Sequence, residues 1–326
     1  MDNKALYRKT LGFSLRRALW DILCIVIVAG LSAAGFLIME KSNDNGLAGL
    51  GIGAVIGIAV IIFILRFVSY YYKAGQIAMM TRGIVEGELP ENVVQEGRRT
   101  VKERFATVAA FFAVTGVIKG IFNQLGSAIS SVGEKIGGDT GSAVGGAVSG
   151  VINTIVSYLC DCCLGWVFFR KDVKAAKATC EGAVIFFRHG KTLAKNLGRI
   201  FGIGLVSLVI IGGIVGGIAY PILGNQTEML HEVADEIREA NAQNGEPNRV
   251  LTFLSDEGNL RIGCAALLGL IVWAIVHSVF IRPFVLTGVL RNYINSGLGD
   301  IPDEASFALL DGKSAKFKKL HAEAAA

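Results

Sequence analysis

Three ionisable side chains stand inside long apolar stretches, where a charge is costly and therefore suggests a function. Asp161 lies within VSYLCDCCLGWVFF, Lys119 follows an apolar run that begins at Phe105, and His277 lies within LIVWAIVHSVF. Asp161 is either a cation or proton site that faces an inner cavity, or a carboxyl that is hydrogen-bonded inside a helix bundle. These three residues form the candidate intramembrane polar site.

The other two members of this site also have two readings each. Lys119 either pairs with Asp161 or extends toward the lipid headgroups, as long basic side chains do near the ends of spans. His277 is suited to titrate near neutral pH, but a single intramembrane histidine is more often packed and hydrogen-bonded.

The sequence carries no motif of a soluble enzyme: it lacks GxxxxGK, HExxH and GxSxG. Cys160, Cys162 and Cys163 are adjacent, so they point to different sides of a helix and suit small buried residues better than a metal site. We therefore expect no enzymatic activity, catalytic residue, metal or cofactor. The basic segments suit a membrane surface, so we expect no nucleic-acid partner.

The composition is typical of a membrane protein. Of 326 residues, 52% are hydrophobic and 18% are charged, against roughly 25% charged residues in soluble domains. Residues 1–290 are predicted to form an all-α polytopic membrane helix bundle with about six transmembrane helices and cytoplasmic amphipathic helices. The expected spans, each near the ~20 residues that cross a bilayer, are residues 18–39, 47–72, 105–125, 147–169, 200–223 and 262–284.

Lysine and arginine are unevenly divided among the connections. Of 32 such residues, 24 lie in four alternate segments: 1–17, 73–104, 170–199 and 291–326. Because positive segments stay inside, both termini and the tail 291–326 are expected in the cytoplasm, and the acidic segment 224–261 outside it. We expect the plasma membrane, as the inner membrane of a bacterium.

Glycines recur every fourth residue in GEKIGGDTGSAVGGAVSG, residues 133–150. This spacing places small residues on one helix face, where another backbone can approach closely, within one chain or in a homo-oligomer. Segment 126–150 is an outer helix, a re-entrant hairpin or, as we favour, an extension of two spans beyond the bilayer. The predicted helix-packing residues are Gly133, Gly137, Gly141, Gly145, Gly212 and Gly216.

Two stretches suggest an internal repeat. Residues 74–91, AGQIAMMTRGIVEGELPE, and residues 286–304, LTGVLRNYINSGLGDIPDE, both end in glycine, an acid, a branched apolar residue, proline and an acid. Residues 167–187, VFFRKDVKAAKATCEGAVIFF, share the run-out from a span and the amphipathic part but lack the proline motif. The chain is therefore expected to contain three membrane hairpins, each followed by a helix along the cytoplasmic surface.

Residues 157–213 and 270–297 resemble the C-terminal half of the choline transporter-like family. The resemblance rests on a cysteine-rich span end, SYLCDCCLGW, a basic amphipathic stretch, an arginine-led span and the last span with its exit, HSVFIRPFVLTGVLRNYINSG. It covers about a quarter of the chain, which has fewer spans than the family and lacks its large outer domain. The resemblance implies a transporter-like bundle whose substrate is a small organic cation.

Two functions from different classes follow from these patterns. The first is a transporter or channel for a small solute or ion, indicated by the repeat, the glycine faces and Asp161. The second is a non-transporting accessory or assembly protein that binds lipids or partner proteins through its basic cytoplasmic segments. An internal cavity lined by Asp161 would distinguish the first function from the second.

Overall fold

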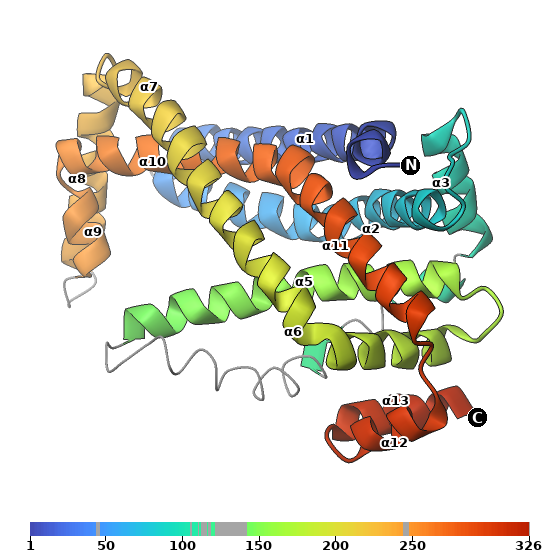
Figure 1. Ribbon diagram of the computed structural model, residues 1–326. Helices are drawn as coiled ribbons and strands as arrows, with labels where there is room; N and C mark the ends of the chain where they lie inside the picture. Colours follow the sequence, from blue (N-terminus) through green and yellow to red (C-terminus); the bar gives the residue numbers. More distant parts are fainter. Residues whose placement is uncertain are drawn as a thin grey trace. The chain divides into compact units, whose positions relative to one another are not determined.

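The computed structural model describes residues 1–43, 46–104, 106–109, 111, 116, 119–120, 142–243 and 248–325. Every regular element in these residues is helical, which confirms the predicted all-α class (Figure 1). In chain order the elements are α1 (Asn3–Asn43), α2 (Gly46–Val85), α3 (Val93–Glu103), α5 (Ser142–Phe169), α6 (Ala175–Ser207), η1 (Leu208–Gly212), α7 (Gly213–Leu223), α8 (Thr227–Gln243), α9 (Arg249–Leu254), α10 (Glu257–Val276), η2 (His277–Ile281), α11 (Arg282–Gly299), α12 (Glu304–Asp311) and α13 (Ala315–Ala325). The short elements η1 and η2 are π-helical turns.

The chain folds into two compact units, each built from separate parts of the sequence. We call residues 18–67 and 202–281 the apolar unit, and residues 1–17, 68–201 and 282–326 the basic unit. The basic unit contains all four segments in which lysine and arginine are concentrated, so the uneven charge of the sequence corresponds to a division in the fold.

The apolar unit exposes large apolar side chains along its helices. Leu19, Val55, Val209 and Leu267 are each 57–68% exposed, and each has exposed apolar neighbours on the same helix. Single exposed leucines are ordinary, but continuous apolar surface on several helices is suited to contact with lipid.

Three helical stretches in the described residues are long and apolar enough to cross a membrane, so the chain is a membrane protein. They are Asn3–Ser42, Gly202–Leu223 and Glu257–Gly299, and only 6–17% of the most apolar part of each is buried. Two further apolar helices, Ala48–Ile62 and Val156–Phe169, are shorter. Three of the six expected spans, 18–39, 200–223 and 262–284, thus correspond to candidate membrane helices, and six spans stay a prediction. Most of the expected span 105–125 lies outside the described residues.

Small residues bring the helices of the apolar unit close together. A methyl group added at Gly269 of α10 would lie 2.5 Å from the carbonyl oxygen of Gly212, and one added at Gly216 would lie 3.3 Å from that of Ala265. In the hairpin of α1 and α2, Gly35 and Gly49 contact each other in the same way. Such contacts favour association because the backbones approach at short range.

The basic unit has a buried apolar core. All residues of α5 from Tyr158 to Phe168 are buried, including the fully covered Trp166. The stretch from Tyr158 to Phe168 of the expected span 147–169 is therefore covered by α2, α6 and α11, whereas Thr154 of the same helix is exposed. Gly165, for example, lies against Thr81 of α2 and Leu290 of α11.

Helix α2 differs from its prediction. The sequence suggested a span that ends near Tyr72, followed by an amphipathic helix at the surface. Instead the helix continues to Val85, and every residue from Ala74 to Thr81 is buried. The pattern AGQIAMMT is nearly apolar, so this stretch is stabilised in a protein core better than in an interface.

The repeated proline motif links helices at two corresponding places. After α2, Gly87 adopts a positive φ of 80°, and α3 begins at Val93. After α11, the carboxylate of Asp303 accepts the backbone N–H of Ser306 and caps α12. The tail then folds back as α13, and Phe307 and Phe317 are buried between these helices and the rest of the basic unit.

Candidate functional site

Asp161 lies in α5 and contacts two cations. Its Oδ1 is 2.5 Å from Nζ of Lys73, and its Oδ2 is 3.0 Å from Nη2 of Arg282. The Asp161 side chain is only 5% exposed, whereas those of Lys73 and Arg282 are 23% and 29% exposed. Each carboxylate oxygen therefore has its own positive partner. We call these three residues the Asp161 cluster.

Three helices position the Asp161 cluster, one residue from each. Lys73 lies in α2 directly before the buried stretch, Asp161 in the middle of the buried part of α5, and Arg282 at the start of α11. About one turn along α5, the missing side chain of Gly165 allows Thr81 to approach, and its hydroxyl donates to the Gly165 carbonyl at 3.4 Å. The cluster thus lies where α2, α5 and α11 converge.

Arg282 has further partners on α5. Its Nη2 donates to Oγ of Ser157 at 2.7 Å, and its guanidinium lies 5.3 Å from the ring centroid of Tyr158. A planar guanidinium with several donors can bind a carboxylate, a hydroxyl and an aromatic face together. Arg282 is therefore held mainly by α5.

The electrostatics of the cluster favour a closed site. Two cations face one carboxylate, which leaves one positive charge in excess and both carboxylate oxygens occupied. A further cation would have to displace Lys73 or Arg282 before it reached Asp161. The arrangement suits a buried ion pair that fixes three helices, and breaking such a pair by removing one partner typically costs about 3–5 kcal/mol.

The three candidate polar residues of the sequence are all among the described residues. Lys119 is exposed and is not among the ion-pair partners that the described residues give Asp161. His277 belongs to the apolar unit, where its ring lies 5.1 Å from that of Trp273. Of the two interpretations of Lys119, pairing with Asp161 has no support among the described contacts, because Lys73 and Arg282 occupy both oxygens. Extension of Lys119 toward the headgroups stays a prediction.

His277 begins η2, one of the two π-helical turns. Pro283 follows this turn and has no N–H to donate to the preceding turn of the helix, which explains a local change of hydrogen bonding. The indole N–H of Trp273 donates to Oγ of Ser207 at 3.1 Å, directly before η1. The two π-helical turns therefore lie on helices that contact each other, and such turns occur frequently at functional sites.

The predicted packing glycines fall into two groups. Gly133, Gly137 and Gly141 lie outside the described residues, and Gly145 is in α5 within a stretch whose side-chain surroundings are not described. Gly212 and Gly216 face the backbone of α10 in the same chain. The three interpretations of segment 126–150 stay predictions, and so does the formation of a homo-oligomer through its glycines.

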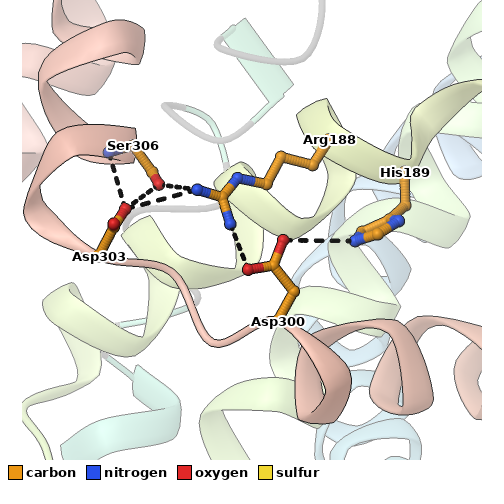
Figure 2. A network of polar contacts seen from close by, with 5 residues as sticks. All are labelled: Arg188, His189, Asp300, Asp303 and Ser306. Carbon is orange, nitrogen blue, oxygen red and sulfur yellow. Dashed lines mark hydrogen bonds and ion pairs between the residues drawn. The ribbon is translucent and has the colours of Figure 1, made fainter.

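A second polar network joins α6 to the linker between α11 and α12 (Figure 2). Arg188 donates to Oδ1 of Asp300 at 2.6 Å, and its other arm reaches Asp303 and Ser306. His189 lies 4.0 Å from Oδ2 of Asp300. Hydrogen bonds from Ser306 lower the pKa of Asp303, so this carboxylate stays charged at neutral pH. The proline motif of the repeat is thus anchored by a basic residue.

A third group closes the turn between α5 and α6. Glu181 accepts hydrogen bonds from the indole N–H of Trp166 at 2.9 Å and from Arg170 at 3.0 Å. Burial nevertheless raises the pKa of Glu181, because the two donors do not fully replace water. Arg170 also pairs with Asp172, which lowers the pKa of Asp172. This group ties the turn between α5 and α6 to the buried carboxylate of Glu181.

Sequence reasoning did not identify Lys73, Arg282 and Arg188 as members of polar networks. Each lies in or beside a basic segment, where a charge at the membrane surface is the simplest interpretation. The sequence did contain an indication that Lys73 is partly buried, since it directly precedes the nearly apolar stretch 74–81. None was present for Arg188, whose partners are more than a hundred residues away.

The described residues contain no group of three or more His, Cys, Asp or Glu side chains that could hold a metal ion. Two of the cavities formed by described residues lie in the basic unit. One, of about 420 Å³, lies beside Arg82, Glu96 and Phe168, and the other, of about 550 Å³, lies beside Lys9 and Arg16. Neither is lined by Asp161. Comparison of the chain with protein-family models, curated proteins and solved structures finds no match.

Proposed function

We propose that the chain is a non-transporting membrane accessory or assembly protein that binds lipids or partner proteins through its basic unit. The observation that carries this proposal is the pairing of both Asp161 oxygens with Lys73 and Arg282. The strongest sequence argument for transport was an acid that faces a cavity. With its partners supplied by the chain itself, Asp161 is better suited to hold three helices together.

The division of charge supports the same proposal. All four segments rich in lysine and arginine belong to the basic unit, while the acidic segment 224–261 belongs to the apolar unit. In a membrane, positive segments stay on the cytoplasmic side. We therefore place the basic unit and both termini in the cytoplasm, at the plasma membrane, where the anionic inner surface attracts positive charge.

Flux through reconstituted vesicles tests the proposal. The purified chain is placed in liposomes with a proton, potassium or choline gradient, beside protein-free vesicles. We expect no flux above the protein-free rate and no difference for Asp161→Asn. The matched control is Asp172→Asn, which removes an exposed carboxylate of the same unit. Flux that depends on Asp161 but not on Asp172 would overturn the proposal.

A transporter or channel for a small solute or ion is the second candidate, and one observation favours it. The π-helical turns η1 and η2 lie on contacting helices of the apolar unit, with His277 at the start of η2. If these turns serve transport, His277→Ala should change flux in the same vesicles, while exposed His231→Ala should not. A small organic cation is the substrate suggested by the choline transporter-like resemblance.

A further inference from the structure

The first turns of α1 pack on α3 within the basic unit (Figure 1). A methyl group at Gly12 would lie 3.0 Å from Cγ2 of Val94, and the ring of Phe13 fills the space at Gly97. Residues three and four apart share one face of a helix. Lys9 and Arg16 therefore lie on the same face of α1 as Gly12 and Phe13, one turn to either side of the contact.

This arrangement leaves a cavity of about 550 Å³ between α1 and the start of α3. Its lining includes Lys9, Arg16 and Arg98, with Asn92 and Gln95 as neutral donors and Glu91 as the single acid. Three cations against one carboxylate give the cavity a net positive charge. Its volume lies in the range of roughly 300–1,000 Å³ that is typical of ligand sites.

The three cations lack acidic partners of their own. Within the described ranges, no ion pair includes Lys9, Arg16 or Arg98. By contrast, Arg82 and Arg99, on the neighbouring turns of α2 and α3, both pair with Glu96. Cations gathered at one cavity repel each other, so an anion that enters the cavity lowers their free energy.

The position of the cavity indicates which anion it meets. Arg16 is followed after one residue by the apolar run that begins at Ala18, and Leu15 beside it is 46% exposed. The candidate membrane helix Asn3–Ser42 thus carries its cations at the polar end of its apolar surface. Lipid phosphates occupy this depth of a bilayer, while lipid tails contact the apolar side chains.

We infer that this cavity binds the phosphate headgroup of an anionic glycerophospholipid. Lys9, Arg16 and Arg98 contact the phosphate, Asn92 and Gln95 donate to its glycerol oxygens, and the acyl chains extend along α1. Glu91 weakens the binding. The inference deepens the proposed lipid-binding role by naming its site and ligand class.

Lipid retention tests the site directly. The full chain is purified in neutral detergent, mixed with equal amounts of phosphatidylglycerol and phosphatidylcholine, and examined by native mass spectrometry. We expect preferential retention of phosphatidylglycerol, reduced about fivefold for each cation removed in Lys9→Gln, Arg16→Gln and Arg98→Gln. The matched control replaces the exposed Lys316, Lys318 and Lys319 of α13 by glutamine and should keep the preference. Equal loss in both sets would overturn the inference.

Two further measurements distinguish loss of a lipid site from loss of folding, and binding of a lipid from binding of free phosphate. Glu91→Gln removes the opposing charge and should increase retention of phosphatidylglycerol, a gain that a misfolded variant cannot give. Inorganic phosphate in tenfold excess should leave the lipid bound. Displacement by inorganic phosphate, or no gain for Glu91→Gln, would refute a lipid site. The flux measurement is independent of these results, so failure of the lipid site and failure of the proposed function are distinguishable.

Discussion

Nζ of Lys73 lies 2.5 Å from Oδ1 of Asp161, although the two residues belong to segments that the sequence assigns to different environments. Lys73 opens a basic connection, and Asp161 stands in the middle of an apolar run. Their contact shows that α2 and α5 meet inside the basic unit. The acid therefore lies among its counter-charges and not in a lipid-facing or hydrated position.

Replacing Asp161 by asparagine should destabilise the basic unit. The change leaves Lys73 and Arg282 partly buried without their counter-charge, a situation that typically costs about 3–5 kcal/mol. Since both cations retain some access to water, the lower end of this range is expected. Thermal unfolding of the detergent-solubilised chain measures the effect, and exposed Asp172→Asn serves as the control. Equal unfolding temperatures for the two variants would contradict a closed Asp161 cluster.

Valine at Gly269 should separate the helices of the apolar unit. Its side chain would collide with the backbone of Gly212, at a typical cost of about 1–3 kcal/mol for an overpacked site. Gly217 on α7 has open space around it and is the control. Hydrogen exchange of α7 and α10 should increase for Gly269→Val and stay unchanged for Gly217→Val. Unchanged exchange in both variants would show that the two helices do not meet there.

Alanine at Gly87 should destabilise the link between α2 and α3. Gly87 has a φ of 80° and open space around it, so an added methyl group strains only the backbone, by about 1 kcal/mol. Gly299 begins the corresponding motif as the last residue of α11, without a positive φ, and alanine should be tolerated there. The difference in free energy of unfolding between Gly87→Ala and Gly299→Ala measures this strain. Equal values would mean that the two motifs share one conformation.

The contact between α8 and α10 should weaken as the pH rises. A hydrogen bond to Glu257, and the charge of Asp235, raise the pKa of His231 in the folded chain. A raised pKa means that the protonated form is stabilised by folding, so this contribution is complete below about pH 6.5, the ordinary value. It is lost as the pH passes through the folded pKa. Hydrogen exchange of α8 should therefore increase with pH more in the native chain than in His231→Gln, after correction for intrinsic exchange. If exchange of α8 increased equally with pH in both proteins, the charge of His231 would not stabilise the contact between α8 and α10.

Much of the fold followed from patterns of single residues. Apolar runs predicted the helical class and three candidate membrane helices, and the motifs that begin at Gly87 and Gly299 mark two links between helices that differ in the conformation of the glycine. The sequence was less informative where an apolar helix leaves the membrane-facing surface and enters a protein core. Residues 74–81 and 156–169 are apolar whether lipid or protein covers them, so composition alone could not distinguish a membrane span from the core of a helical unit.

The candidate site shows the same limit. The acid itself was identified because an isolated carboxylate in an apolar run is costly. Its partners were not, since Lys73 and Arg282 come from helices whose mutual contacts depend on tertiary packing. Lys119 was considered as a partner of Asp161 because it was the available cation within an expected span, and its exposed side chain suits the other interpretation, extension toward the headgroups.

The most direct test is a double-mutant cycle between Lys73 and Asp161. Free energies of unfolding are measured for the native chain, Lys73→Met, Asp161→Leu and the double variant. If the carboxylate is held by Lys73, the double variant should be more stable than the sum of the single effects by at least about 1 kcal/mol. Effects that add within about 0.3–0.5 kcal/mol would mean that the two residues do not interact, and would contradict the closed cluster.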